Sequence, residues 1–216
     1  MTHSDQLALD KKNIDTILVL DFGSQYTQLI ARRIRELDVF SVILPWDISK
    51  ERIAALNPAG IILSGGPESV TNNNTPRIPE IIFDLEIPIL GICYGMQTLA
   101  EQFGGQVTAS KTKEFGHTSI TIEAANTLFD GFDIGSSIDV WMSHGDHVSS
   151  LPDQFHLIAS TPSAPIAAMA HTEKPIYALQ FHPEVTHTKE GDIVLQNFIF
   201  KICNCQAQWK MHNLIE

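Results

Sequence analysis

The chain has 216 residues, of which 44% are hydrophobic and 18% charged, and its formal net charge is −11. This composition is typical of a folded globular protein and excludes a disordered one. A chain of this length can bury roughly 70–75% of its unfolded surface, so it needs no disulfide or metal in order to fold. The acidic balance argues against a general binder of nucleic acids or anionic membranes, whose phosphates attract clustered lysines and arginines.

No apolar run approaches the ~20 residues of a transmembrane helix, so we expect none. The polar residues 1–14 lack the apolar centre of a signal peptide and are expected to form a flexible tail. The three cysteines, Cys93, Cys203 and Cys205, are sparse and odd in number. They therefore favour a reducing cytoplasm over a disulfide framework.

The N-terminal half alternates short apolar strands with amphipathic helices. This alternation predicts right-handed βαβ units and a buried, mostly parallel sheet. Ligands bind such sheets beyond the carboxyl ends of the strands, where the segments DFGSQ, SGGPES and GICYGMQ lie. We expect strands at 16–21, 40–44, 60–66 and 88–92, and helices after Ser24, after Ser49, at 79–85 and at 94–103.

From about residue 106 the pattern becomes strand-like segments separated by turns, and residues 191–204 form a closing helix. We therefore predict one α/β domain over residues 15–205. It consists of a mostly parallel, doubly wound central sheet flanked by helices, with an added antiparallel or mixed strand region. These later strands are expected at 106–110, 117–124, 138–144, 155–161, 165–171 and 175–181.

A cysteine stands where an apolar strand turns directly into a helix, in the segment Gly91-Ile92-Cys93-Tyr94-Gly95. Small residues on both sides permit a tight turn that projects the side chain above the sheet, which is the nucleophile-elbow pattern with cysteine in place of serine. The N-terminus of the following helix favours a thiolate there. A lone cysteine is more often packed in a core, but the paired glycines favour a nucleophile.

A thiolate nucleophile needs a base, and among the nine histidines His182 has the most suitable context. It follows the strand expected at 175–181 and precedes Pro183, which keeps the backbone out of a helix. Residues i and i+2 share one face of an extended chain, so Glu184 is placed to orient the imidazole. The alternative is a surface turn in which both side chains are merely solvated.

Acyl transfer also requires hydrogen-bond donors for an oxyanion. Gly65 and Gly66 end a strand and expose backbone N–H groups, and the N–H of Tyr94 supplies a second donor. The same segment has an alternative interpretation, because SGGPES is similar to the SGGxDS phosphate loop of ATP pyrophosphatases. Its proline lacks an N–H that such a loop would use, and its glutamate replaces the aspartate. The oxyanion role is therefore favoured.

The segment Ser143-His144-Gly145-Asp146-His147 has the His/Asp/His spacing of a metal site. No third partner at helical spacing supports a metal, and Gly145 indicates a turn, so we expect this segment to line a substrate pocket. Cys203-Asn204-Cys205 lacks a second Cys/His pair and is interpreted as a helix end with unpaired thiols. We predict no metal site.

Three motifs, GICYGMQ, HPE and SGGP, occur in an order and at separations that resemble the class I, triad-type glutamine amidotransferases. The resemblance covers roughly residues 15–203. It implies that Cys93 attacks the carboxamide carbon of L-glutamine, that His182 transfers protons and that Glu184 orients His182. The backbone N–H groups of Gly66 and Tyr94 would hold the oxyanion. The walls that bind glutamine would come from Gly65, Gln97, Ser143, His144, Gly145 and Asp146.

Residues 21–37, the SGGPESV loop, KEFGH and WMSHGDHV resemble one subgroup of that family, in which an ATP-pyrophosphatase domain follows. The tail QWKMHNLIE resembles the first residues of that domain, so residues 206–216 are expected to begin a linker or the domain itself. The resemblance implies no cofactor for the amidotransferase domain, and ATP and Mg²⁺ for a following domain that aminates adenylylated XMP. It implies a homodimer for the full-length enzyme and neither nucleic-acid nor membrane partners.

Three other functions remain open. The first is the glutaminase subunit of another amidotransferase, such as anthranilate synthase, but the segments FGSQYTQLIARR and WKMHNLIE argue against it. A thiol hydrolase or redox-sensing protein on a similar fold would usually lack an HPE pair on a later strand. A regulatory domain that binds a partner without turnover is the third, because amidotransferase domains often need their synthetase partner to close the site.

Overall fold

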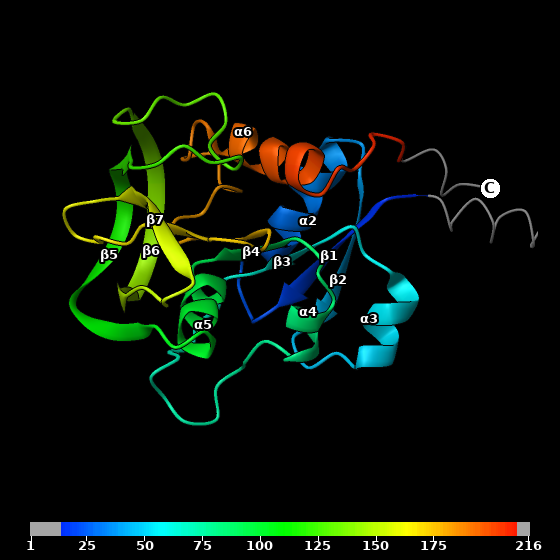
Figure 1. The fold of residues 1–216 in the computed structure, drawn as a ribbon, viewed down its shortest axis with the longest axis horizontal. Helices are drawn as coiled ribbons and strands as arrows, with labels where there is room; N and C mark the ends of the chain where they lie inside the picture. Colours follow the sequence, from blue (N-terminus) through cyan, green and yellow to red (C-terminus); the bar gives the residue numbers. More distant parts are fainter. Residues whose placement is uncertain (1–13, 211–216) are drawn as a thin grey trace, which may run out of the picture.

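The computed structural model describes residues 14–210, with the backbone alone for residues 110–113. Within this range a nine-stranded sheet runs through the molecule in the order β2-β1-β3-β4-β9-β8-β7-β5-β6 (Figure 1). The expected tail, except for residue 14, and residues 211–216 of the expected C-terminal segment lie outside the described residues.

The N-terminal part of the sheet has the predicted alternation of strands and helices. Ser49 caps α3 by accepting a hydrogen bond from the N–H of Arg52, as expected. Ser24 does not cap α2, because its Oγ accepts from the N–H of Tyr26, and Tyr26 is itself the N-cap residue. The elements are β1 (Thr16–Asp21), α2 (Thr27–Glu36), β2 (Phe40–Pro45), α3 (Lys50–Leu56), β3 (Gly60–Leu63), α4 (Ile81–Asp84), β4 (Ile89–Ile92) and α5 (Tyr94–Gln102).

The C-terminal part extends this sheet with antiparallel strands. β5 (Gln106–Ile122) is one long strand where the sequence predicts two segments, and its register against β6 (Ser137–Ser150) shifts between Ala109 and Glu114. β7 (Phe155–Ser160), β8 (Ala168–His171) and β9 (Ile176–Leu179) follow. β9 pairs antiparallel with β8 but parallel with β4. The predicted α/β class, a parallel sheet with an added antiparallel region, is confirmed.

Helices cover both faces of the parallel strands (Figure 1). One core contains residues of α2, of α6 (Gly191–Gln196) and of the π-helix η2 (Asn197–Ile202), and the other contains residues of α3, α4 and α5. Alternate residues of β1 divide between the two cores, because successive side chains of a strand point to opposite faces. No helix in residues 14–210 combines the length and apolar character needed to cross a bilayer.

The pairing of β4 with β9 positions the site. Ile92 lies opposite Leu179 in parallel register, so the segments after both strands emerge at the same edge of the sheet. The N–H of Cys93 donates to the carbonyl of Leu179 at 2.7 Å, which extends the pairing by one residue. His182 follows β9 by three residues and therefore lies close to Cys93.

Candidate active site

Cys93 occupies a strained turn between β4 and α5. Its backbone has φ 52° and ψ −105°, a region that residues with a Cβ rarely adopt. The flanking glycines are required by close packing. A Cβ at Gly91 would lie 2.7 Å from Leu99 Cδ1, and one at Gly95 would lie 2.6 Å from the carbonyl oxygen of Leu63. The predicted strand–turn–helix is therefore present, with the cysteine at its apex.

His182 and Glu184 form a buried pair beside this turn. Their Nδ1 and Oε1 atoms are 2.7 Å apart, and the two residues are only 3% and 1% exposed. The backbone on both sides is fixed, because Thr188 Oγ1 donates to the carbonyl of His182 at 2.6 Å and Arg33 Nε donates to that of Glu184 at 3.0 Å. The Tyr26 ring packs against the imidazole in a T-shaped arrangement, with ring centroids 5.2 Å apart.

The surroundings of His182 favour its protonated form. Burial is the largest single influence and lowers the pKa, but the charge of Glu184 and hydrogen bonds with Cys93 and Glu184 outweigh it. Together they raise the pKa of His182 well above its ordinary value of 6.5. An imidazolium beside a cysteine sulfur stabilises the thiolate form. This arrangement suits nucleophilic chemistry.

Two further groups contact the sulfur of Cys93. Its Sγ lies 3.5 Å from the carbonyl oxygen of Ser143, and Gln180 Nε2 donates to it at 3.7 Å. Gln180 also accepts a hydrogen bond from Gln97 Nε2 at 3.4 Å. These contacts link the sulfur to β6, to the end of β9 and to α5 at once.

A pocket of about 520 Å³ opens above Cys93 and His182. This volume lies within the range of small-molecule sites. Gly65 stands against the reactive pair, since a Cβ there would lie 3.3 Å from His182 Cε1 and 3.5 Å from Cys93 Cβ. Gly65 itself does not line the pocket. Besides Cys93 and His182, the lining residues come from DFGSQ and the adjacent Tyr26, from SGGPES, from GICYGMQ, from the Ser143–Asp146 segment and from β5: Gly23, Ser24, Gln25, Tyr26, Gly66, Pro67, Glu68, Ser69, Gln97, Phe115, Ser143, His144, Gly145 and Asp146.

The Ser143–Asp146 segment forms one wall of the pocket. His144 Nδ1 lies 2.9 Å from the carbonyl oxygen of Asp146, and its Nε2 lies 3.1 Å from Glu114 Oε2. Burial lowers the pKa of His144, although the charge of Glu114 opposes the shift. Gln97 Nε2 donates to the carbonyl of Asp146 at 2.8 Å. Within residues 14–210 no group of three or more His, Cys, Asp or Glu side chains is placed to hold a metal ion.

Two backbone N–H groups are predicted to bind an oxyanion, those of Gly66, which lines the pocket, and of Tyr94, which directly follows Cys93. Within residues 14–210, neither the N–H of Gly66 nor that of Tyr94 donates to another protein group. Gly66 is pressed against the preceding loop, where a Cβ would lie 2.5 Å from the carbonyl oxygen of Phe22. The Tyr94 side chain points into the core and leaves its N–H at the start of α5.

Sequence reasoning missed three residues of the site. Gln180 had a usable signal, because it stands two positions before His182 and so shares its face of the strand. Tyr26 directly follows the DFGSQ loop, which was already a candidate. Ser69 is the last residue of the SGGPES loop, also a candidate, but the bond from its Oγ to the Asp146 carboxylate had no sequence signal because the two residues are 77 positions apart.

Comparison with known proteins indicates the same family as the sequence motifs. The family model "Glutamine amidotransferase class-I" matches residues 18–202. A relative from Hamiltonella defensa named GMP synthase (glutamine-hydrolyzing) is 54% identical over 213 residues, which cover 95% of this chain and 41% of the relative. One of the same name from Ectopseudomonas mendocina is 53% identical and is covered to 39%, with 93% of this chain. The chain thus spans about two fifths of the length of these relatives.

Solved structures with a similar fold include members of the same family. A Thermoplasma acidophilum protein named "putative gmp synthase subunit a protein" has a TM-score of 0.77 and 37% identity, with 89% of this chain and 95% of that one covered. A glutamine amidotransferase from Thermotoga maritima, 19% identical, shares the fold with a TM-score of 0.70 over 88% of this chain and 98% of its own. The chain belongs to the class-I glutamine amidotransferase family.

Proposed function

We propose that this chain hydrolyses L-glutamine to glutamate and ammonia through Cys93, His182 and Glu184. The observation that carries the proposal is the buried His182–Glu184 pair, 2.7 Å apart, beside a cysteine held on a strained strand–helix turn. Membership of the class-I amidotransferase family supplies the substrate class.

The first half of the reaction forms a thioester. The Cys93 thiolate attacks the carboxamide carbon of glutamine, and the oxygen of the tetrahedral intermediate is held by the N–H groups of Gly66 and Tyr94. The imidazolium of His182 gives its proton to the departing nitrogen, so the C–N bond breaks and ammonia leaves. A γ-glutamyl thioester on Cys93 remains, and Glu184 keeps the imidazole oriented throughout.

The second half of the reaction restores the enzyme. Neutral His182 takes a proton from water, and the resulting hydroxide attacks the thioester carbon. The C–S bond then breaks, which releases glutamate and returns the Cys93 thiolate beside a protonated His182. Gly65, Gln97 and the Ser143–Asp146 segment, with His144 and Gly145, would bind the α-amino and α-carboxylate groups of glutamine.

In a longer protein we propose that the ammonia aminates adenylylated XMP to give GMP. ATP and Mg²⁺ would be used by a following ATP-pyrophosphatase domain, and the full-length enzyme would be a cytoplasmic homodimer. Support comes from the names of relatives 53–54% identical to this chain. The SGGPES segment fits a role in glutamine chemistry better than a role in ATP binding, because its residues Gly66, Pro67, Glu68 and Ser69 line the pocket above Cys93.

The test is covalent labelling with 6-diazo-5-oxo-norleucine, a glutamine-mimicking electrophile, followed by mass spectrometry of wild type and Cys93→Ala. We expect one adduct on Cys93, absent from the variant and blocked by glutamine, together with glutamate release that Cys93→Ala abolishes. The proposal fails if neither this chain nor the longer protein supplied with XMP and ATP gives that adduct.

A further inference from the structure

The segment that joins β3 to α4, here called the 64–80 loop, contains no helix or strand. Its first part lines the pocket through Gly66, Pro67, Glu68 and Ser69. Irregular segments of this length are usually functional, and each residue held in one conformation loses entropy. Strong anchors are therefore needed to keep the pocket side of the loop in place.

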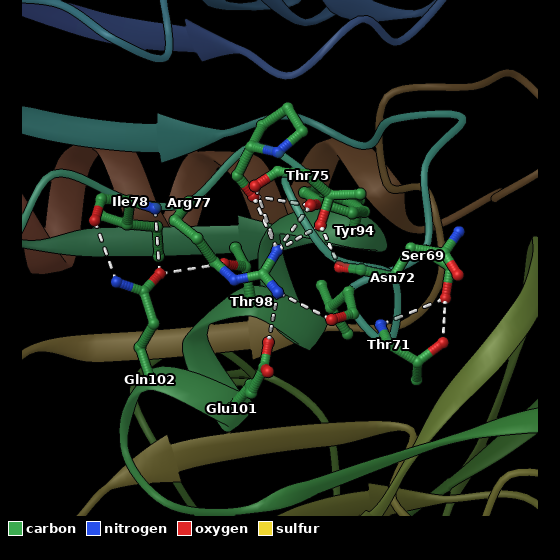
Figure 2. Close-up of polar contacts among 12 residues, drawn as sticks. Ser69, Thr71, Asn72, Thr75, Arg77, Ile78, Tyr94, Thr98, Glu101 and Gln102 are labelled. Atoms are coloured by element: carbon green, nitrogen blue, oxygen red, sulfur yellow. Dashed lines mark hydrogen bonds and ion pairs between the residues drawn. The ribbon is translucent and has the colours of Figure 1, made fainter.

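Arg77 provides such an anchor, because its guanidinium bridges the loop and α5 (Figure 2). Nη2 donates to the carbonyl of Val70 at 2.7 Å and pairs with Glu101 Oε2 at 3.1 Å. Nη1 donates to Thr75 Oγ1 at 2.5 Å and to the Tyr94 hydroxyl at 3.2 Å. A planar fork of donors can satisfy both sides at once, which a lysine ammonium cannot do in the same geometry.

One side of α5 completes the attachment. The Tyr94 hydroxyl donates to the carbonyl of Pro76 at 2.6 Å. Gln102 makes two bonds to Ile78, donating from Nε2 to its carbonyl and accepting at Oε1 from its N–H, both at 2.9 Å. Thr98 Oγ1 donates to the same Oε1 at 2.9 Å. Tyr94, Thr98 and Gln102 are spaced four apart along α5 and therefore share one face of the helix.

These contacts hold together the two segments that carry the proposed oxyanion donors. Gly66 lies at the start of the 64–80 loop, and Tyr94 both starts α5 and anchors the loop through its side chain. Beyond Gly66, Ser69 also donates to the Asp146 carboxylate, so the loop contacts the opposite wall of the pocket. The spacing between the N–H groups of Gly66 and Tyr94 therefore depends on how firmly the loop is held against α5.

We propose that Arg77 is a positioning residue, which fixes the 64–80 loop against α5 so that the Gly66 and Tyr94 N–H groups stay aligned for the oxyanion. The inference rests on the proposed glutaminase activity. Removal of the guanidinium leaves the Val70 carbonyl and the Tyr94 hydroxyl without their donor, and the loop relaxes. A displacement of ~1 Å at a reacting centre can cost about 100-fold in rate.

The test is steady-state glutamine hydrolysis by Arg77→Met. We expect kcat to fall by about 10- to 100-fold, with KM changed less than about threefold, because an interaction made mainly in the transition state affects kcat. Arg77→Lys should recover part of the loss. Arg32→Met is the control: it removes an arginine on α2 whose side chain is 75% exposed, and it should behave as wild type.

Tyr94→Phe provides a second, milder variant in case Arg77→Met folds poorly. It removes only the hydroxyl that Arg77 contacts, and it should lower kcat by less than Arg77→Met. The double variant should be slower than Arg77→Met by less than the factor that Tyr94→Phe produces alone. The Arg77–Tyr94 contact is lost in both single variants, whereas the bond from the Tyr94 hydroxyl to the Pro76 carbonyl is lost only with the hydroxyl.

The outcomes separate this inference from the function on which it rests. Wild type without glutamine turnover and without a Cys93 adduct would refute both. An active wild type with unchanged kcat in Arg77→Met would overturn the inference alone, even if the variant melts at a lower temperature. A rise in KM with kcat unchanged would also overturn it, because the loop would then serve glutamine binding and not the oxyanion.

Discussion

His182 and Glu184 are separated by one proline, and this spacing alone places both side chains on the same side of an extended backbone. The surrounding fold then excludes water from the pair and adds the sulfur of Cys93. Burial of the imidazole would by itself leave it neutral, yet Glu184 and Cys93 raise the pKa of His182 well above 6.5. The charge state of this one side chain is therefore set by its two neighbours.

Glu184→Gln removes the carboxylate that supports this charge. Wild-type activity should persist on the alkaline side until pH passes the raised pKa of His182, and the substitution should move that limb to lower pH. We also expect kcat to fall roughly 10²- to 10⁴-fold, because the imidazole loses its orienting partner. A pH–rate profile of both proteins measures the two effects. An alkaline limb that stays in place would contradict this assignment.

The same pair makes stability depend on pH. Because the pKa of His182 is raised on folding, its stabilising contribution is fully present below the unfolded value of about 6.5 and is lost as pH rises through the folded value. In Glu184→Gln, burial still lowers that pKa while the raising influence of the carboxylate is gone, so the stabilising contribution of protonated His182 shrinks. Urea unfolding should therefore show the largest difference between the proteins near pH 6 and a smaller one at alkaline pH.

Among the elements, α6 packs directly against the His182–Glu184 segment. Gly191, the first residue of α6, approaches Pro183 so closely that a Cβ would lie 2.0 Å from the Pro183 carbonyl oxygen. Gly191→Ala should therefore displace either the helix or the segment. We expect a loss of about 1–3 kcal/mol in unfolding free energy and a clear fall in glutamine turnover.

A matched variant separates the two effects of Gly191→Ala. Gly135 lies in an open turn with φ 82° and nothing within 4 Å of a Cβ, so Gly135→Ala strains only its own backbone. It should cost about 1–2 kcal/mol without changing kcat. Equal activity in the two variants, measured well below their melting temperatures, would refute the support given by α6.

Elements formed by local signals were predictable, and elements formed by distant contacts were not. The turn at Cys93 could be read from two glycines around one residue, and the cap at Ser49 from the residue type alone. The π-helix after α6 and the continuous β5 had no local signal. The attachment of the 64–80 loop through Arg77 also escaped prediction, because its partners Glu101 and Tyr94 lie on a helix 17–24 residues later and nothing in the intervening residues specifies the contact.

At the scale of the whole molecule, the three thiols differ in environment. Cys203 and Cys205 directly follow η2 and are buried, and burial raises the pKa of Cys203 beyond the usual range and that of Cys205 to about 12. A shift from 9 to about 12 lowers the thiolate fraction about a thousandfold. Iodoacetamide should therefore leave both unmodified in the native protein and alkylate all three cysteines in denaturant.

Peptide mass spectrometry after timed alkylation distinguishes exposure of these cysteines by global unfolding from exposure by local opening. If Cys203 and Cys205 lose their protection only at the global unfolding transition, the segment that contains them opens together with the rest of the fold. Modification at the rate of a free thiol under native conditions would show local opening and would contradict the burial of these residues.

The parallel pairing of β4 with β9 has a consequence for how the chain folds. Ile89 pairs with Ile176, so the two strands that carry Cys93 and His182 meet only after a chain loop of nearly 90 residues has closed. Contacts of such long sequence separation form slowly, since their closure entropy must be overcome before they contribute stability. The helices of the N-terminal half can form without that closure. Recovery of catalytic activity on refolding therefore reports when β4 and β9 have paired.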